Sequence, residues 1–245
     1  MKKYSILILS IAVLLVSACK SGGSYKNANP KTSMDSVSYA VGLQIASQLR
    51  QNGLDSTINP ELLARAIYDV MNSKKQLFGG DTIAAVLMKQ FNPQAYQQAE
   101  FNKKKEKDFF AKNGTAADVK TTSSGLQYQI ISTGTGQKPT ESNTVKVHYK
   151  GMLLDSTVFD SSIDRKEPAI FPLANLIQGW KEGILLMPVG SKFKFFVPSK
   201  LAYGMQGIPQ AGIGPNEPLI FEVELISIEP DAPQMNPMEM QQEMH

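Results

Sequence analysis

The residues that could form a reactive or binding site lie in the second half of the chain, and most of them are aromatic. One acidic residue, Asp160, directly follows Phe159, and Trp180 directly follows Gly179. Tyr203 stands between alanine and glycine in the sequence AYG, where we expect a loop rather than core. Aromatic rings can enclose an apolar ligand, and a single carboxylate can orient its polar edge. The pattern therefore indicates a non-covalent binding site.

Metal and hydrolytic chemistry lack the residues that they need. The two histidines are His148, at an outward position of an expected strand, and His245, at the terminus, and no set of cysteines accompanies them. No G-x-S-x-G sequence is present to hold a serine nucleophile. The G-T-G sequence that begins at Gly134 is too short for a phosphate loop and indicates a hairpin turn. We therefore expect no metal, no cofactor and no covalent step.

The other carboxylates near Asp160 do not form an evident acid–base pair. Asp155 lies in a turn context, and Asp164 is followed directly by Arg165. These adjacent opposite charges predict a local ion pair between Asp164 and Arg165. Asp160 therefore remains as the carboxylate that we expect beside the aromatic residues.

The overall composition is that of a globular protein without a strong charge bias. The chain has 245 residues, of which 42% are hydrophobic, enough for one large domain or two smaller ones. Without Lys2 and Lys3, which lie in the N-terminal export-like segment, 23 basic side chains stand against 22 acidic ones. Nucleic acid is therefore not indicated as a partner.

The N-terminus has the pattern of a lipoprotein export signal. Its apolar run from Ile6 to Val16 is shorter than the roughly 20 residues that span a bilayer, and it follows basic residues. The sequence V-S-A-C, which ends at the only cysteine, Cys19, resembles a bacterial lipobox, with Val16 where leucine is usual. We predict that residues 1–18 are removed, that Cys19 carries acyl chains that anchor the protein to a membrane, and that residues 19–31 form a flexible tether.

Residues 32–92 predict three short amphipathic helices. Apolar residues recur at helical spacing from Asp35, the expected N-cap, to about Gln51. A second helix is expected to open at Asn59, which is followed by proline, and a third near Asp81. Because three such helices have little core of their own, we expect a dimerisation domain that pairs with a second copy. A monomeric bundle is the alternative.

A fourth helix is predicted from Pro93 to Lys112, with Asn113 and Gly114 as its end. Its middle, QQAEFNKKKEKD, is nearly all polar, and the acidic residues offset part of the lysine charge. We interpret the lysines as a solvated face rather than as a membrane or nucleic-acid contact. A helix of about 20 residues is about 30 Å long, so residues 93–118 are expected to connect two domains.

The chain after Lys120 changes to a strand pattern. Val145, Val147 and Tyr149 alternate with polar residues, and only one brief helical piece, around 176–183, interrupts the strands. This pattern predicts an antiparallel sheet wrapped on a short helix. The predicted fold class is therefore α+β, with a helical N-terminal region, a long connecting helix and the sheet domain.

The ordered motifs of this half closely resemble the FKBP family of peptidyl-prolyl cis–trans isomerases. They are VKVHYKGMLLDSTVFDSS from Val145, LIQGWKEG from Leu176, VPSKLAYG from Val197 and PLIFEVELISIE from Pro218. The layout of the whole chain is similar to the Gram-negative macrophage-infectivity-potentiator subgroup. The organisation that follows is a signal peptide at 1–18, a tether at 19–31, a helical dimerisation domain at 32–92, a connecting helix at 93–118, an FKBP-type domain at 119–229 and a disordered tail at 230–245.

The resemblance also implies a set of site residues. The catalytic group would be Phe159, Asp160, Trp180 as the base of the pocket, and Tyr203, whose hydroxyl would reach a bound carbonyl. The backbone N–H of Ile177 would donate to another ligand carbonyl. The substrate-binding residues would be Tyr149, Phe171, Leu176, Ile177, Phe221 and, from the last loop, Ile213.

The implied activity is isomerisation of X-Pro bonds in proline-containing peptides and unfolded exported proteins, and macrolides are possible inhibitors. The implied location is the periplasmic side of a Gram-negative outer membrane, as a lipid-anchored homodimer. The alternative function is a non-catalytic chaperone or interaction protein that works through the helical dimer cleft. A purely structural envelope protein is a third interpretation, but it leaves the loop tyrosine without a purpose.

Overall fold

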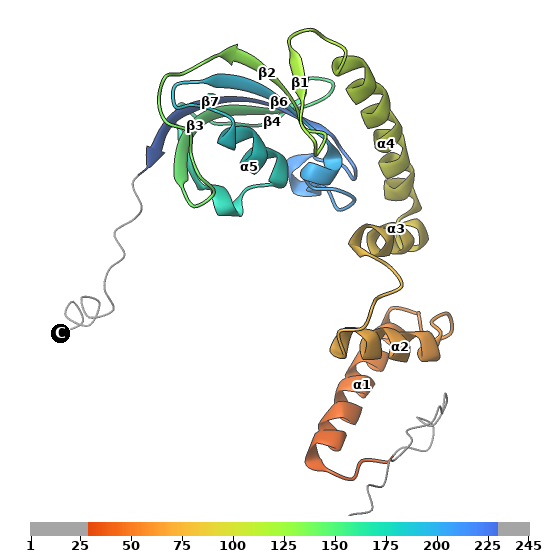
Figure 1. Ribbon diagram of the computed structural model, residues 1–245. Coiled ribbons are helices and arrows are strands. Elements are labelled where there is room, and N and C mark those ends of the chain that lie inside the picture. The colour runs from red at the N-terminus through yellow and green to blue at the C-terminus, as the bar shows by residue number, and fades with distance from the viewer. Residues whose placement is uncertain (1–28, 230–245) are drawn as a thin grey trace, which may run out of the picture. The chain divides into compact units, whose positions relative to one another are not determined.

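The computed structural model describes residues 29–229 (Figure 1). The predicted signal peptide, Cys19 and the tail at 230–245 lie outside the described residues. The chain divides into two compact units, one up to Gln76 and one from Leu77 onward. Within residues 29–229, no helix is both long enough and apolar enough to cross a bilayer.

The first unit contains helices α1 (Ser33–Gln51) and α2 (Pro60–Met71). The prediction that Asp35 caps α1 is wrong, because Thr32 is the cap and Asp35 is the third helical residue. Thr32 Oγ1 accepts the backbone N–H of Asp35 at 3.1 Å, and the Asp35 carboxylate accepts that of Thr32 at 2.9 Å. Asn59 caps α2 as predicted, and neither helix has a buried residue.

The second unit begins with α3 (Gly80–Phe91) and α4 (Pro93–Asn113), close to the predicted bounds. The interpretation of the lysines of α4 as a solvated face holds for Lys103 and Lys104, which are exposed. Another side of α4 is buried, because Ala99 is 0% exposed and Asn102 1%. That side of α4 packs against the sheet domain, because Asn102 hydrogen-bonds to residues near the start of the last strand.

A single antiparallel sheet follows, and it confirms the predicted α+β class. Its strand order is β1-β2-β6-β7-β3-β4, with β5 also paired to β3. The short helix α5 (Gln178–Leu185) lies in the concavity of the sheet (Figure 1). The strands are β1 (Val119–Thr121), β2 (Gln127–Ser132), β3 (Thr144–Leu153), β4 (Val158–Ser161), β5 (Ala169–Pro172), β6 (Lys192–Val197) and β7 (Leu219–Glu229).

The core lies between α5 and the sheet, and strand alternation produces it. Val145, Val147 and Tyr149 of β3 are buried, while the residues between them, Lys146 and His148, are only partly buried. Gly183 allows α5 to approach the sheet closely, because a Cβ at this position would lie 2.7 Å from the ring of Phe195. The opposite end of the same helix presents Trp180, which is 4% exposed.

The register of the central strand brings site residues from three strands together. Gly151 of β3 pairs with Asp160 of β4 on one side and with Phe221 of β7 on the other. Tyr149 lies two residues before Gly151 on the same strand, so its side chain is on the same face of the sheet. Tyr149 and Phe221, which are more than 70 positions apart in the sequence, are thereby brought together around Gly151.

Candidate binding site

A cavity of about 290 Å³ opens where the end of α5 meets β3, β4 and β7. It is about as large as the smaller of the ligand pockets in proteins. Every predicted site residue except Ile213 lines it, together with Asn175, which the sequence did not suggest. The lining residues are Tyr149, Phe159, Asp160, Phe171, Asn175, Leu176, Ile177, Trp180, Tyr203 and Phe221.

Trp180 forms the base of the cavity, and three aromatic rings meet it edge to face. The ring centroids of Tyr149 and Phe221 are each 5.2 Å from that of Trp180, and that of Phe171 is 5.9 Å away. The interplanar angles lie between 84° and 89°, the T-shaped arrangement that aromatic pairs favour. Phe159 in turn packs edge to face on Phe221 at 5.7 Å. The packing fixes the rings and leaves the indole as a rigid apolar surface.

The indole nitrogen of Trp180 is buried and has no hydrogen-bond partner within residues 29–229. Leaving a buried donor unsatisfied costs about 1–3 kcal/mol, which most core positions avoid. The cost is consistent with a tryptophan that is retained for its flat apolar face. The base of the cavity therefore offers a ligand an aromatic surface rather than a polar anchor.

Asp160 supplies the polar edge of the cavity, and two neighbours hold its carboxylate. The Tyr149 hydroxyl donates to Asp160 Oδ2, and the Arg165 guanidinium pairs with Asp160 Oδ1. Arg165 Nη2 also donates to the Tyr149 hydroxyl at 3.0 Å, so the three side chains form a closed ring of hydrogen bonds. The predicted ion pair between Asp164 and Arg165 is wrong, because Arg165 turns to Asp160 instead.

The electrostatics of this network keep Asp160 charged. Burial disfavours the carboxylate, but the hydrogen bonds from Tyr149 and Arg165 and the charge of Arg165 outweigh it and hold the pKa of Asp160 below its usual 3.8. Burial raises the pKa of Tyr149, and the hydrogen bond to Asp160 adds to the rise. At neutral pH the cavity therefore has a carboxylate that only accepts hydrogen bonds and a neutral tyrosine hydroxyl that donates to this carboxylate and accepts from Arg165.

Two further donors at the cavity have no partner among the described residues. The Tyr203 hydroxyl makes no hydrogen bond, and burial together with the nearby charge of Asp160 raises its pKa, so the proton stays on the oxygen. The backbone N–H of Ile177 likewise has no acceptor, although the Ile177 carbonyl accepts from Trp180 N at 3.0 Å. Both groups are free to donate to carbonyl oxygens of a ligand.

Ile213 does not line the cavity. It is 2% exposed and forms an isolated bridge with Ile208, with hydrogen bonds between their backbones in both directions. This pairing turns its side chain into the core beside the site. The missed residues, Arg165 and Asn175, lie in a turn and in the short 3-10 helix before α5, where the sequence has no periodic pattern that could identify them.

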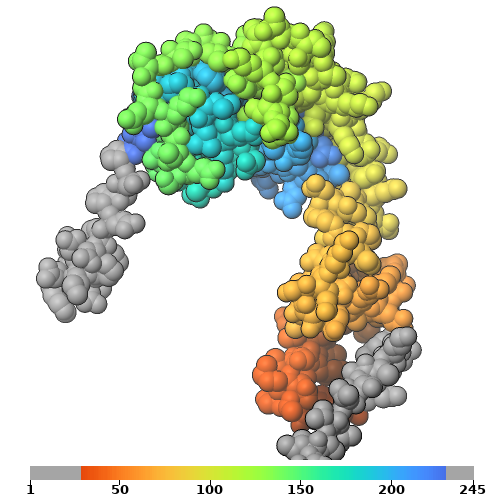
Figure 2. All heavy atoms as spheres, in the orientation of Figure 1, coloured from red at the N-terminus to blue at the C-terminus, as the bar shows by residue number. Residues whose placement is uncertain are grey.

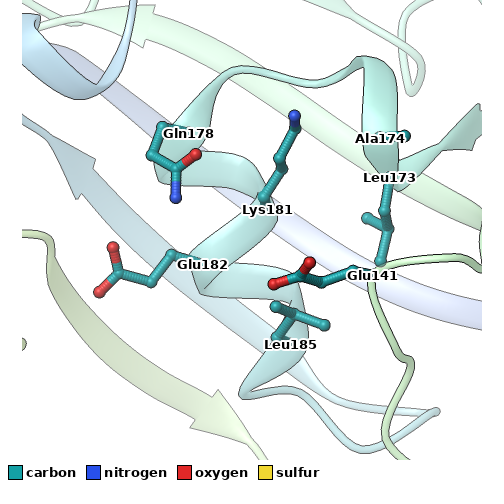
Figure 3. Close-up of a pocket in the computed structure, with 7 residues that line it drawn as sticks. All are labelled: Glu141, Leu173, Ala174, Gln178, Lys181, Glu182 and Leu185. Atoms are coloured by element: carbon teal, nitrogen blue, oxygen red, sulfur yellow. The ribbon is translucent and has the colours of Figure 1, made fainter. Parts of the chain in front are cut away.

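A larger hollow, of about 440 Å³, runs along the solvent side of α5 (Figure 3). Lys181, Glu182 and Leu185 line it from α5, and Glu141 lines it from the loop before β3. Glu182 is already engaged, since it accepts a hydrogen bond from Ser124 Oγ at 2.7 Å. This hollow contains no aromatic ring and none of the predicted residues. The smaller cavity at Trp180 is therefore the better candidate for binding an apolar ligand.

The described part of the chain contains no group of side chains suited to bind a metal ion. Across residues 29–229, no three His, Cys, Asp or Glu side chains gather closely enough to hold a metal ion. His148 is occupied by a contact of 3.1 Å between its Nδ1 and Ser162 Oγ. The cavity can enclose an apolar ring and orient polar groups at its rim, but it presents no activated nucleophile.

Comparison with known proteins gives two family matches. Residues 135–226 match the family described as FKBP-type peptidyl-prolyl cis-trans isomerase, and residues 34–130 match the domain amino terminal to FKBP-type peptidyl-prolyl isomerase. The FKBP-type peptidyl-prolyl cis-trans isomerase FkpA of Aeromonas hydrophila is 42% identical over 218 residues, which cover 84% of this chain and 80% of that protein.

Two further relatives extend the comparison. The outer membrane protein MIP of Legionella longbeachae is 41% identical over 204 residues, covering 80% of this chain and 86% of that protein. The crystal structure of FkpA from Escherichia coli is similar with a TM-score of 0.56 and 32% identity, and the match covers 83% of this chain and 100% of that one.

Proposed function

The chain belongs to the FKBP-type peptidyl-prolyl cis-trans isomerase family, and we propose that it rotates X-Pro bonds in the cavity above Trp180. The family match confirms the resemblance and the isomerase activity that the motifs predicted. The observation that supports this site is the contrast between the indole base, enclosed by three rings, and the single charged group at the rim, Asp160. The substrates are proline-containing peptides.

The mechanism follows from what limits the uncatalysed reaction. Amide resonance keeps the X-Pro bond planar and creates a barrier of about 18–20 kcal/mol. The twisted transition state loses this resonance and part of the amide dipole, so water solvates it less well than the planar state. A cavity that excludes water removes this preference for the planar state, and binding energy from fixed contacts then favours the twisted geometry.

The lining residues divide into two roles in this mechanism. Trp180, Phe159 and Phe221 hold the proline ring against apolar surfaces. The Tyr203 hydroxyl and the Ile177 backbone N–H donate to carbonyl oxygens on either side of the bond, because neither has a partner of its own among the described residues. Asp160 orients the polar edge of the peptide. Macrolides with a proline-like ring would compete for the same surfaces.

Substitution of the rim and the base tests this assignment. Phe159→Ala, Asp160→Asn and Tyr203→Phe should each reduce kcat/KM on a short proline peptide while the circular dichroism spectrum stays that of the folded protein. Glu141→Gln, in the hollow along the solvent side of α5, is the control and should keep full activity. Unchanged kcat/KM in all three cavity variants would reject the cavity as the site.

We further propose that the mature protein is a lipid-anchored envelope protein that assists the folding of exported proteins. Cys19 would carry the lipid, residues 19–31 the tether, and the outer membrane, facing the periplasm, would be the location. The V-S-A-C sequence supports the anchor, and the name of the Legionella relative, outer membrane protein MIP, supports the location. Fractionation of cells that express the chain, followed by lipid analysis of the N-terminal peptide, tests both points.

We also propose that the helices of residues 32–92 form a homodimer. No residue of α1, α2 or α3 is buried within one chain. Apolar side chains on α1 and α2 are more than half exposed, at 52% for Leu43, 60% for Leu62 and 60% for Val70. Helices of this size obtain most of their stability from packing, so a second copy is the occupant that would bury these side chains.

The same exposed surface supports the second candidate function, a chaperone that holds unfolded chains in the helical cleft. An apolar groove of about 290 Å³ between α1 and α2, lined by residues such as Ile45, Leu49 and Leu63, favours this role. Aggregation suppression by the full chain and by residues 119–229 alone separates the two functions. A holdase role predicts that suppression is lost with the helices while isomerisation of a short peptide remains.

A further inference from the structure

Helix α4 bonds to both ends of the segment 199–217, which carries Tyr203. Figure 2 shows the atoms of this segment, in blue, against those of α4, in yellow to yellow-green. The segment leaves the sheet after β6, contains Tyr203 and ends at the start of β7. Since the Tyr203 hydroxyl has no partner among the described residues, its position depends on how the backbone of this segment is held.

The first end is held by Glu106 of α4. Glu106 Oε2 accepts the backbone N–H of Ser199 at 2.6 Å. The Ser199 carbonyl in turn accepts the backbone N–H of Gly204 at 2.9 Å, which closes the turn that presents Tyr203. A carboxylate that accepts a backbone N–H makes a stronger hydrogen bond than a neutral acceptor does, so this contact fixes the start of the segment.

The second end is held by Asn102, whose side-chain nitrogen and oxygen both form hydrogen bonds. Asn102 Nδ2 donates to the Pro215 carbonyl at 2.9 Å and to Glu217 Oε2 at 2.7 Å. Its Oδ1 accepts from Gln98 Nε2 at 2.9 Å. Glu217 is also buried, and Lys105 Nζ lies 3.6 Å from its other oxygen. Both amide protons of Asn102 are therefore used to bind the end of the segment.

Asn216, which lies between Pro215 and Glu217, connects the second end of the segment to Tyr203. The backbone N–H of Asn216 donates to the Gly204 carbonyl at 2.7 Å. The Asn216 side-chain amide lies 3.4 Å from the Ala99 carbonyl on α4. Asn102 thus holds Pro215 and Glu217, the two neighbours of Asn216, and Asn216 bonds to Gly204, which directly follows Tyr203.

We propose that Asn102 is a positioning residue of the isomerase, because it sets the place of the Tyr203 hydroxyl through residues 215–217. A buried amide is costly in a helix that only connects two domains, since an apolar residue would pack there without hydrogen-bond requirements. The cost is understandable if the amide orients the segment next to the cavity. The inference rests on the proposed role of Tyr203 in binding a substrate carbonyl.

The test is a double-mutant cycle between Asn102 and Tyr203 in the full chain. Asn102→Asp keeps the shape but removes both donors and places two carboxylates together, so kcat/KM on a short proline peptide should fall about tenfold. Tyr203→Phe should also reduce kcat/KM. If Asn102 acts through the Tyr203 hydroxyl, adding Asn102→Asp to Tyr203→Phe should cause little further loss. Gln97→Glu, the same amide-to-carboxylate change at an exposed position of α4, is the matched control.

The result that overturns the inference is additivity, in which Asn102→Asp costs the same with and without the tyrosine hydroxyl. Adding Glu217→Gln to Asn102→Asp should recover part of the activity, because the new amide at position 217 can donate to the carboxylate at position 102 instead of repelling it. If no activity is recovered, that result also counts against the inference. Should Asn102→Asp not fold, Asn102→Leu, which is similar in size and also removes both donors, replaces it in the cycle with the same expectation. Full activity of Tyr203→Phe alone would instead refute the role of Tyr203, and the two failures are therefore distinct.

Discussion

Replacing Gly151 by alanine tests whether the aromatic wall of the cavity must stay in its place. A Cβ at Gly151 would lie 2.7 Å from both Cε2 and Cζ of Phe159 and 3.0 Å from Cε1 of Phe221. Ordinary contact begins at 3.4 Å, so the Phe159 ring must retreat by about 0.7 Å in a closely packed region. Because Phe159 lines the cavity, we expect the ring to move into the space that would hold the proline.

A displacement of this size has two measurable consequences. Overpacking should lower the free energy of unfolding by about 1–3 kcal/mol. Misplacement by most of an ångström should lower kcat/KM by up to about 100-fold. The assay measures isomerisation of a short proline peptide by NMR exchange. The temperature is kept far below the Tm of the variant, so that all of the protein is folded.

The control is Gly42→Ala, at a helical position where no heavy atom lies within 4 Å of the new Cβ. This variant should keep full activity and gain about 0.5–1 kcal/mol of stability, as helical glycines do when they become alanine. Wild-type kcat/KM in folded Gly151→Ala would refute the idea that the geometry of the rings matters to the reaction.

Because the pKa of Asp160 is lowered, the contribution of its carboxylate to stability and to substrate orientation is complete above the usual pKa of 3.8 and is lost as the pH falls below that value. When kcat/KM and Tm are measured against pH, both should therefore decline only at the acidic end. Asp160→Asn should remove this pH dependence. Arg165→Met removes the charged partner of that carboxylate and should reduce kcat/KM about tenfold, with the acidic decline shifted to higher pH. Leu43→Glu places a charge on the exposed apolar side of α1 and should give monomers in light scattering, whereas a persistent dimer would exclude this surface. Cys19→Ser should abolish metabolic labelling with a radioactive fatty acid, and continued labelling would show that the anchor is elsewhere.

The resemblance to the FKBP family implied the pocket residues, because the sequence presents the motifs of that family in order, with Tyr149 and Phe221 on strands, Trp180 on α5 and Tyr203 in a loop. Tyr149 and Phe221 follow strand alternation, which decides the face of the sheet on which each side chain lies. The charged partner of Asp160, Arg165, could not be found in this way. The turn after β4 folds back, with Lys166 at a positive φ of 59° and its N–H bonded to the Ile163 carbonyl, and this places Arg165 beside Asp160. Adjacency in the sequence, which favoured Asp164, does not describe such a turn.

Local patterns of the sequence alone determined the type and order of the elements, because hydrophobic periodicity acts over a few residues. The ordered motifs carried the resemblance to the family, and that resemblance implied the residues of the apolar cavity. The tertiary structure decided which polar groups meet. Asn102 belongs to a stretch of α4 that looks solvated on its own, yet it is buried by hydrogen bonds to residues more than 110 positions away. Whether a polar side chain is solvated or forms hydrogen bonds within the protein depends on long-range packing, which no local pattern encodes.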